Sequence, residues 1–430
     1  MNTEILESKE RKLIVSEMAE TLIGSEIINL AWQINELIAN GKNISNLTIG
    51  DFDPRIFPIP DLLTEEIKKA YDEHHTNYPP ANGTLELRKE VSAFIYKRGG
   101  LEYSPEEIMI TSGARPVIFA AYDTLVDLDD VIIFPVPSWN NNHYTHLSRA
   151  RSVTVETKPE NHFMPTAADI KPHIKKASLI SLCSPLNPTG TVFSEKEISD
   201  ISDLIVEENY RRGDKEKPLY LLFDQIYWLL TLGDTKHYNP VLLNPELRNY
   251  TVFVDGISKA FCGTGVRVGW AYGPKKIINK MNSITSHMGA WAPKAEQIAI
   301  SRYLKMDDEV DSFLNSFKLK ISESLNDFYN GFMRLKEIGY NIDVIAPQAS
   351  IFLTVKIDLT GKVKQDGTVL KNTNDITNFL IDEANLALVP FASFGASKDS
   401  KWYRVSVGTI TREEVKKVFM NLENALSKLS

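Results

Sequence analysis

A lysine lies directly after a short β-rich run in the stretch DGISKAFCGTGVRVGWAYG, residues 255–273. Lys259 follows the run Thr251–Val254, and three glycines come soon after it. A lysine in a partly desolvated site has a lowered pKa and can attack a carbonyl carbon to form a Schiff base. Because a lone loop lysine is usually a solvated surface residue, this interpretation depends on the residues that the fold brings near it.

Other polar residues also follow predicted strands. Asp224 ends the apolar run LYLLFD, Tyr227 comes three positions later, and Asn187 lies in the tight loop SPLNPTG. A carboxylate at the end of a buried strand is costly unless it meets a cation or a strong donor, although a helix N-cap aspartate would also explain it. In open parallel sheets, ligands bind at the carboxyl ends of the strands, so we expect these residues to share one site.

An anion site is suggested by SGARPVIFAAYDTL, residues 112–125, where a glycine turn precedes an apolar helix with Pro116 predicted as its first residue. Such a helix end presents backbone N–H groups to a phosphate. Arg267 can grip a phosphate as a charged fork, and Trp139 in PVPSWNNNHY can stack on a flat ring. An ordinary turn and a core tryptophan are the alternatives. Together with Lys259 and Asp224, these are the parts that pyridoxal phosphate requires.

The elements that must position these residues alternate along the chain. Between about 105 and 275, short apolar β-rich runs alternate with helical patterns, which predicts an α/β fold with a mostly parallel sheet sandwiched by helices. The runs are Ile108–Thr111, Val131–Phe134, Leu179–Cys183, Tyr220–Phe223, Thr251–Val254 and Val268–Ala271. One helix is marked by the capping-box pattern of Ser194 and Glu197. We expect residues 55–315 to form this large cofactor-binding domain.

The two ends of the chain predict a smaller α+β domain. The first forty residues have an apolar stripe at helical spacing, with Gly41 at the expected C-terminal cap. Later residues predict further elements: a helix at Phe317–Ile338, a strand at Ser350–Ile357, a helix at Asp375–Ala384, a strand at Tyr403–Val407 and a capped helix from Thr411. We expect residues 1–54 and 316–430 to form the small domain.

Composition bounds the class of protein. The 430 residues are 43% hydrophobic and 24% charged, as in ordinary soluble globular proteins. A net charge of −8 argues against nucleic-acid binding and does not favour an anionic membrane. Cys183 and Cys262 are too few for a disulfide framework or a four-cysteine metal site, and they suit a reducing compartment. No metal site is predicted. With a polar N-terminus and no apolar run of about 20 residues, a cytoplasmic protein is predicted.

From about Leu47 to its C-terminus, the chain resembles the fold type I pyridoxal-phosphate enzymes of the aspartate aminotransferase superfamily. Seven motifs occur in family order: YPPANGTLELR, SGARP, PVPSW, SPLNPTG, DQIYW, SKAFCGTGVRVGW and WYRVSVG. The resemblance implies an aspartate aminotransferase-like fold, pyridoxal 5'-phosphate as cofactor and a homodimer with shared active sites. It also implies an aminotransferase that moves an amino group between an L-amino acid and a 2-oxo acid in two half-reactions.

The resemblance implies a role for each residue around the cofactor ring. Lys259 would carry the internal aldimine and shuttle the proton at the substrate Cα. Asp224 would pair with the ring nitrogen, Asn187 and Tyr227 would hydrogen-bond the ring oxygen, and Trp139 would stack on the ring.

The remaining matched positions bind the phosphate or the substrate. The residues that would bind the cofactor phosphate are Gly113, Ala114, Arg115, Ser258, Arg267 and, from the neighbouring subunit, Tyr78. Arg404 would bind the substrate α-carboxylate, with Asn187 and the backbone of Gly50 beside it.

The chain departs from the family pattern in places. Gln225 replaces an acid in DQIY, Gly256 stands where some members have a serine, and the region SHMGAWAPK supplies no arginine for a distal carboxylate. A β-eliminating lyase or synthase on the same scaffold stays an alternative. A DNA-binding regulator is disfavoured because no such domain fits before Leu47. A nicotinamide enzyme is disfavoured because GTGVRVG precedes a strand instead of opening a helix.

Overall fold

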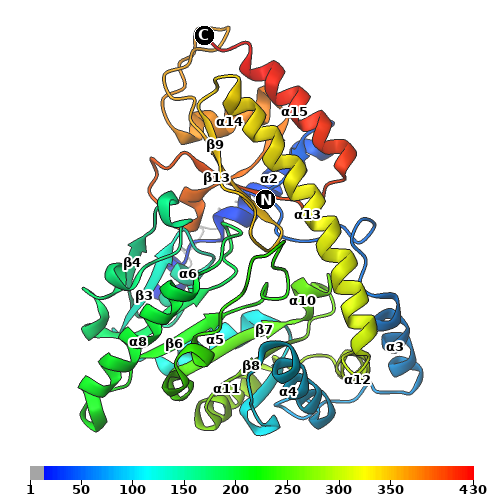
Figure 1. Cartoon of the computed structure of the whole chain (residues 1–430), viewed down its shortest axis with the longest axis vertical. Helices are drawn as coiled ribbons and strands as arrows, with labels where there is room; N and C mark the ends of the chain where they lie inside the picture. The colour runs from blue at the N-terminus through cyan, green and yellow to red at the C-terminus, as the bar shows by residue number, and fades with distance from the viewer. Residues whose placement is uncertain (1–13) are drawn as a thin grey trace, which may run out of the picture.

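A seven-stranded sheet forms the centre of the molecule in a computed structural model that describes residues 14–430 (Figure 1). Its order is β2-β8-β7-β6-β5-β3-β4. The strands are β2 (Ile108–Thr111), β3 (Val131–Val136), β4 (Arg151–Glu156), β5 (Ala177–Cys183), β6 (Tyr220–Asp224), β7 (Thr251–Gly256) and β8 (Gly269–Tyr272). The strands from β4 to β7 pair in parallel, and β8 is antiparallel to both of its neighbours. The predicted fold class is confirmed.

The sequence did not predict β4. This strand lies at the edge of the sheet and pairs only with β3. Arg151–Glu156 reads RSVTVE, with most side chains exposed, so it lacks the apolar run that marks a buried strand.

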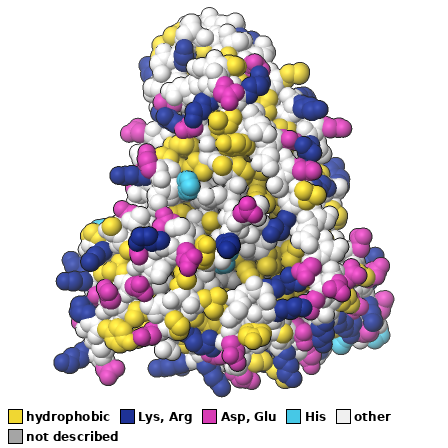
Figure 2. Space-filling view, viewed as in Figure 1, with side chains coloured by type: hydrophobic (Ala, Val, Ile, Leu, Met, Phe, Trp, Pro, Cys, Tyr) yellow, Lys and Arg dark blue, Asp and Glu magenta, His cyan; other side chains and the backbone are white. Residues whose placement is uncertain are grey.

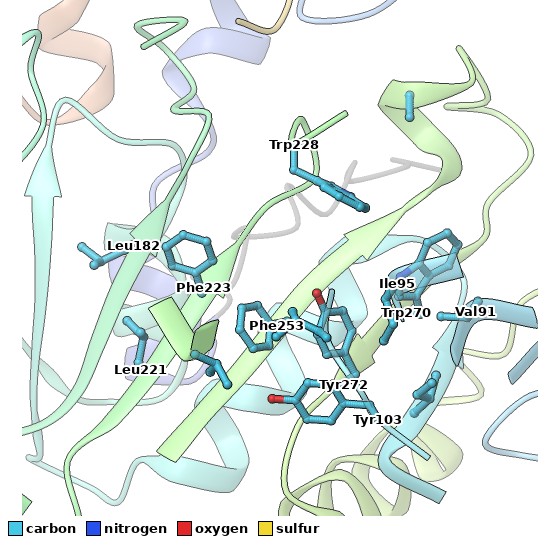
Figure 3. Close-up of a cluster of buried hydrophobic side chains, with 14 of the residues drawn as sticks. Val91, Ile95, Tyr103, Leu182, Leu221, Phe223, Trp228, Phe253, Trp270 and Tyr272 are labelled. Carbon is cyan, nitrogen blue, oxygen red and sulfur yellow. The ribbon is translucent and has the colours of Figure 1, made fainter. Parts of the chain in front are cut away.

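Helices cover both faces of the sheet. The main ones are α4 (Leu85–Gly99), α5 (Ala114–Leu125), α8 (Glu195–Arg212), α11 (Lys275–Met288) and α12 (Lys294–Tyr303). On one face α5 and α11 pack on Ile132, Leu222 and Val254. On the other face α4, α8 and α12 cover a larger core, part of which is drawn in Figure 3 with Phe223 and Phe253 at its centre. The predicted capping box of α8, Ser194 with Glu197, is present.

A second core lies between three helices and a smaller antiparallel sheet. The helices are α13 (Asp307–Glu337), α14 (Thr373–Glu383) and α15 (Arg412–Leu426), and the sheet order is β12-β13-β10-β9. Its strands are β9 (Ile342–Val344), β10 (Phe352–Ile357), β12 (Val389–Pro390) and β13 (Trp402–Ser406). Leu47 and Phe52 from the N-terminal part join this core. The division into domains at 54/55 and 315/316 stays a prediction.

The long helix α13 begins at Asp307 and not at the predicted Phe317. The first turn is acidic, with Asp307, Asp308 and Glu309, which favours a helix start. In Figure 1 this helix runs from the lower part of the molecule to the upper part. It therefore contributes to both cores, through Val310 and Leu314 in one and Phe328 and Phe332 in the other.

The predicted helix of the first forty residues is present in part: the apolar stripe that ends near Gly41 is confirmed by α2, but the helix is not continuous. The structure has a short α1 (Glu17–Thr21) and a longer α2 (Glu26–Ala39), separated by residues 22–25. Gly24 lies in this break, and residues 1–13 are outside the described part of the chain.

Within residues 14–430, no helix combines the length and apolar character needed to cross a membrane. On the face shown in Figure 2, acidic and basic side chains are interspersed over the surface.

Candidate active site

A cavity of about 620 Å³ opens at the carboxyl ends of the parallel strands, the place where open α/β sheets bind ligands. Its volume lies in the range of small-molecule sites. Its wall contains every predicted site residue except Gly113 and Tyr78: Gly50, Ala114, Arg115, Trp139, Asn187, Asp224, Tyr227, Ser258, Lys259, Arg267 and Arg404. Residues far apart in the sequence are thus brought together in one place.

Lys259 lies on the single-turn helix α10 (Ile257–Ala260), directly after β7. Its Nζ donates a hydrogen bond to the carbonyl oxygen of Gly50 at 2.6 Å. Burial is the largest of the effects that together lower the pKa of Lys259 to about 8; the positive charges of Arg404 and Arg115 add to it, and Asp51 opposes them. The amine is therefore much closer to its neutral, nucleophilic form than a surface lysine.

Asp224 ends β6, and the turn after it is not a helix, so the N-cap interpretation does not apply. Its Oδ1 accepts a hydrogen bond from the backbone N–H of Ile226 at 3.0 Å. Burial raises the pKa of Asp224 to about 6, and no Lys, Arg or His among residues 14–430 pairs with it. The carboxylate therefore suits a cationic group of a ligand.

Tyr227 is buried in the same wall, and burial raises the pKa of its phenol. Its ring lies 5.9 Å from Lys259 Nζ. The phenol is therefore a neutral hydrogen-bond donor at ordinary pH, within the same site as the amine.

The N-terminus of α5 forms another part of the cavity wall. Gly113 precedes this helix with φ +93°, and a Cβ atom there would collide with the guanidinium of Arg267. Arg267 donates to the carbonyl oxygens of Thr264 at 2.7 Å and Ser112 at 2.8 Å, which fixes its guanidinium over the helix end. Such a cradle of a cation and free helical N–H groups fits a phosphate.

Pro116 is the third residue of α5, whereas the sequence predicts it as the first. A proline is tolerated throughout the first turn, because its missing N–H would have no intrahelical acceptor there. The first two residues, Ala114 and Arg115, keep their N–H groups for an anion. Ser258, also in the cavity wall, lies one position before Lys259 and is mostly buried.

Arg404 lies on β13 and is only 1% exposed. Its Nη1 donates to Asn187 Oδ1 at 3.0 Å, and its Nη2 donates to the Thr48 carbonyl oxygen at 2.5 Å. The guanidinium carbon lies 4.5 Å from the centre of the Phe352 ring. Burial lowers the pKa of Arg404 to about 10.

A carboxylate would fit beside this guanidinium. Nε of Arg404 is buried without a hydrogen-bond partner in the described part of the chain. A Cβ atom at Gly50 would lie 3.3 Å from the Phe352 ring and 3.5 Å from Arg404 Nη1, so glycine keeps the approach to Arg404 open. A bidentate carboxylate is the ligand that an arginine held in this way recognises best.

Arg115 lies over the indole of Trp139, with its guanidinium carbon 4.7 Å from the ring centre. Its side chain makes no hydrogen bond or ion pair to any residue of 14–430, whereas Lys259, Arg267 and Arg404 each donate to at least one protein oxygen. Arg115 is thus a cavity cation whose whole guanidinium is free of protein acceptors in the described part of the chain.

Sequence reasoning missed several polar residues in the cavity wall, which are Thr48, Asp51, Asn141, Ser181, Cys183 and Thr264. Asn141 comes two residues after Trp139 at the start of helix α6 (Asn141–Leu147), and its Oδ1 accepts from Tyr122 Oη and Ser181 Oγ, each at 3.0 Å. An asparagine so close to Trp139 was a usable signal. The partners on other strands could not be identified without the fold.

Tyr78 does not reach the cavity within one chain. It is 81% exposed, and its ring packs edge-on against Trp291 at 5.1 Å. The interpretation that assigns it to the site of a neighbouring subunit stays a prediction.

Fold and cavity together describe a fold type I pyridoxal-phosphate enzyme, and comparison with known proteins agrees. The model of the family "Aminotransferase class I and II" matches residues 42–422. The chain belongs to this family, and it is a transaminase that uses pyridoxal 5'-phosphate to exchange amino groups between amino acids and 2-oxo acids.

Its relatives cover nearly the whole chain. It is 28% identical over 385 residues to the aspartate aminotransferase of Geobacillus stearothermophilus, covering 89% of this chain and 92% of the relative. It is also 28% identical to the probable aspartate/prephenate aminotransferase of Aquifex aeolicus, covering 90% and 92%. The crystal structure of the aspartate aminotransferase from Rhizobium meliloti shares the fold, with a TM-score of 0.87, 24% identity and coverage of 97% and 100%.

Proposed function

We propose that Lys259 holds the cofactor and moves the proton at the substrate Cα. The observation that carries this proposal is a buried amine with a pKa of about 8 in the same cavity as the unpaired carboxylate of Asp224. Bound pyridoxal phosphate withdraws electrons from the substrate Cα and makes its proton acidic. Asp224 would keep the cofactor ring nitrogen protonated, while Asn187 and Tyr227 would donate hydrogen bonds to the ring oxygen.

The phosphate would lie at the N-terminus of α5. The N–H groups of Ala114 and Arg115, the guanidinium of Arg267 and the hydroxyl of Ser258 are the donors available there. Gly113 is required because any side chain would displace Arg267. Trp139, which lines the same cavity, would stack on the cofactor ring.

Arg404 would bind the α-carboxylate of the amino acid. Its contacts with Asn187 and Thr48 hold the guanidinium in place before substrate arrives, so little ordering is needed on binding. The bound carboxylate would place the Cα of the substrate near Lys259, whose Nζ now bonds the carbonyl of Gly50.

The preferred amino donor is an acidic amino acid such as aspartate. Arg115 is a cation in the cavity wall with no protein acceptor in the described chain, so its guanidinium can bind a second carboxylate. The matched relatives named aspartate aminotransferase support the same class. The backbone N–H of Arg115 would thus bind the cofactor phosphate, and its guanidinium would bind the second carboxylate of the substrate.

A second candidate class is an aromatic or aliphatic donor. The part of the cavity wall contributed by α2 consists of Ile27, Ile28 and Ala31, and apolar walls favour apolar side chains. The two classes differ in their dependence on Arg115.

The test is a measurement of kcat/KM for L-aspartate, L-glutamate, L-leucine and L-phenylalanine. It compares the wild type with Arg115→Gln and with a control, Arg151→Gln, which changes an exposed arginine of β4. A lost charged hydrogen bond costs about 1.5–3 kcal/mol, so Arg115→Gln should lower kcat/KM for the acidic donors about 10- to 100-fold and leave the apolar donors unchanged. Equal losses for all four donors would contradict the acidic-donor proposal. Pyruvate and ammonia formed without an added oxo acid would favour the lyase alternative.

We also propose a homodimer with shared active sites and a cytoplasmic location. The exposed Tyr78, which lies outside the cavity of its own chain, supports a contribution to the partner's site. Cys183 and Cys262 are free thiols, which suits a reducing compartment. The dimer is tested by light scattering of wild type and Tyr78→Ala, where an unchanged mass with weaker cofactor binding is expected in the variant.

A further inference from the structure

Asp255 is a buried carboxyl that the proposed chemistry does not use. It is the penultimate residue of β7 and is 2% exposed. It pairs across the sheet with Trp270 of β8, and Trp228 and Trp270 belong to the aromatic core drawn in Figure 3. A carboxyl group within such a core needs a specific set of donors.

Two donors are present, and they come from two different segments. Asp255 Oδ1 accepts from the backbone N–H of Gly256 at 2.7 Å, and Oδ2 accepts from Trp228 Nε1 at 2.8 Å. Gly256 begins the turn that carries Lys259. Trp228 lies in the tight turn of residues 226–229, which follows Asp224 at the end of β6, and it comes directly after Tyr227.

The two segments are also joined where β6 pairs with β7 as far as Asp224 and Val254, and by the bond from the Gln225 N–H to the Val254 carbonyl oxygen at 3.0 Å. That bond joins the backbones at the strand ends, whereas the Asp255 carboxyl reaches the far side of the turn at Trp228. The indole N–H has no other acceptor in the described chain. Removing the carboxylate would therefore leave buried donors unsatisfied in both turns.

We propose that Asp255 is a positioning residue that fixes Asp224 and the turn of Tyr227 relative to helix α10, which carries Lys259. Its two oxygens hold Trp228 and Gly256, and through them the separation across the cavity between the Asp224 carboxylate and the Lys259 amine. This inference rests on the proposed roles of Asp224 and Lys259. It concerns their geometry, since Asp255 lies outside the cavity wall.

The test uses Asp255→Asn and Trp228→Phe in the cofactor-loaded enzyme. Asn keeps the shape but accepts only one of the two hydrogen bonds, and Phe keeps a ring but removes the indole donor. Small misplacements of reacting groups cost up to about 100-fold in rate, so Asp255→Asn should lower kcat at least about tenfold with KM nearly unchanged. It should also shift the pH midpoint of the cofactor's visible absorbance, and Trp228→Phe should act in the same direction.

A matched control separates positioning from stability. Asn209 on α8 is also buried, at 6% exposure, and its side chain makes two hydrogen bonds to the backbone of Leu219 away from the cavity. Asn209→Ala should lower the thermal midpoint while kcat and the absorbance midpoint stay unchanged. If Asp255→Asn and Trp228→Phe behave like this control, the positioning role is refuted. Failure of the proposed function has a different signature, because Lys259→Ala would then retain the visible absorbance.

Discussion

Replacing Asp224 by Asn should stabilise the cofactor-free protein and disable the enzyme. The pKa of Asp224 rises from 3.8 to about 6 because the carboxylate is buried without a cation. A raised pKa means that the folded state binds the proton more tightly than the unfolded state. The contribution of Asp224 to the free energy of unfolding is therefore fully present below pH 4 and is lost as the pH rises through 6. At about 1.4 kcal/mol for each pKa unit, the loss is about 3 kcal/mol at pH 8.

Asn removes the charge and keeps the shape. Denaturant unfolding of the cofactor-free protein at pH 8 should show Asp224→Asn more stable than wild type by up to about 3 kcal/mol, a gain that shrinks below about 1 kcal/mol at pH 4. Asp399→Asn, in an exposed loop, is the control and should show no such gain. The loaded variant should lose most of its transaminase activity. Equal stability of Asp224→Asn and wild type at pH 8 would refute the claim that the buried Asp224 carboxylate destabilises the protein until a cationic ligand group pairs with it.

Three further outcomes are expected. In the cofactor-free protein, Lys259→Met should raise the thermal midpoint more at pH 6 than at pH 10, because a pKa lowered to about 8 means that burial penalises the ammonium form at low pH. Gly113→Ala should weaken cofactor binding in a spectroscopic titration by displacing Arg267. The control, Gly41→Ala, has the same φ of +93° but open space around it, so it should lower stability through backbone strain and leave cofactor binding unchanged. Arg404→Lys should raise KM about 10-fold or more for every amino donor, since lysine cannot bind a carboxylate bidentately, while the absorbance of the loaded enzyme stays unchanged.

The architecture could be predicted where local patterns are strong. The apolar runs predicted the buried strands of the central sheet, and the capping box at Ser194 and the capped helix from Thr411 are present as predicted. The edge strand β4 was missed because exposed strands carry no apolar run. The start of α13 was placed too late, although its acidic first turn is a start signal, and the break at residues 22–25 was missed because the apolar stripe that marked the helix lies wholly within α2.

The cavity residues could be collected because each follows a strand, and parallel strands end at one edge of the sheet. Their roles stay predictions. What the sequence could not provide are contacts between distant segments. Nothing local links Asp255 to Trp228, or Arg115 to Trp139, and the free capacity of Arg115 appears only when the acceptors of Arg267 and Arg404 are known.

The most direct test of the central claim is the absorbance spectrum of the purified enzyme before and after addition of L-aspartate, without any oxo acid, in wild type and Lys259→Ala. The wild type should show a visible cofactor band that converts to a shorter-wavelength form, and addition of a 2-oxo acid should restore the band. Lys259→Ala should lack that band in the resting enzyme and show no turnover. A wild type that stays colourless after addition of pyridoxal phosphate, or a Lys259→Ala variant with normal turnover, would contradict the account.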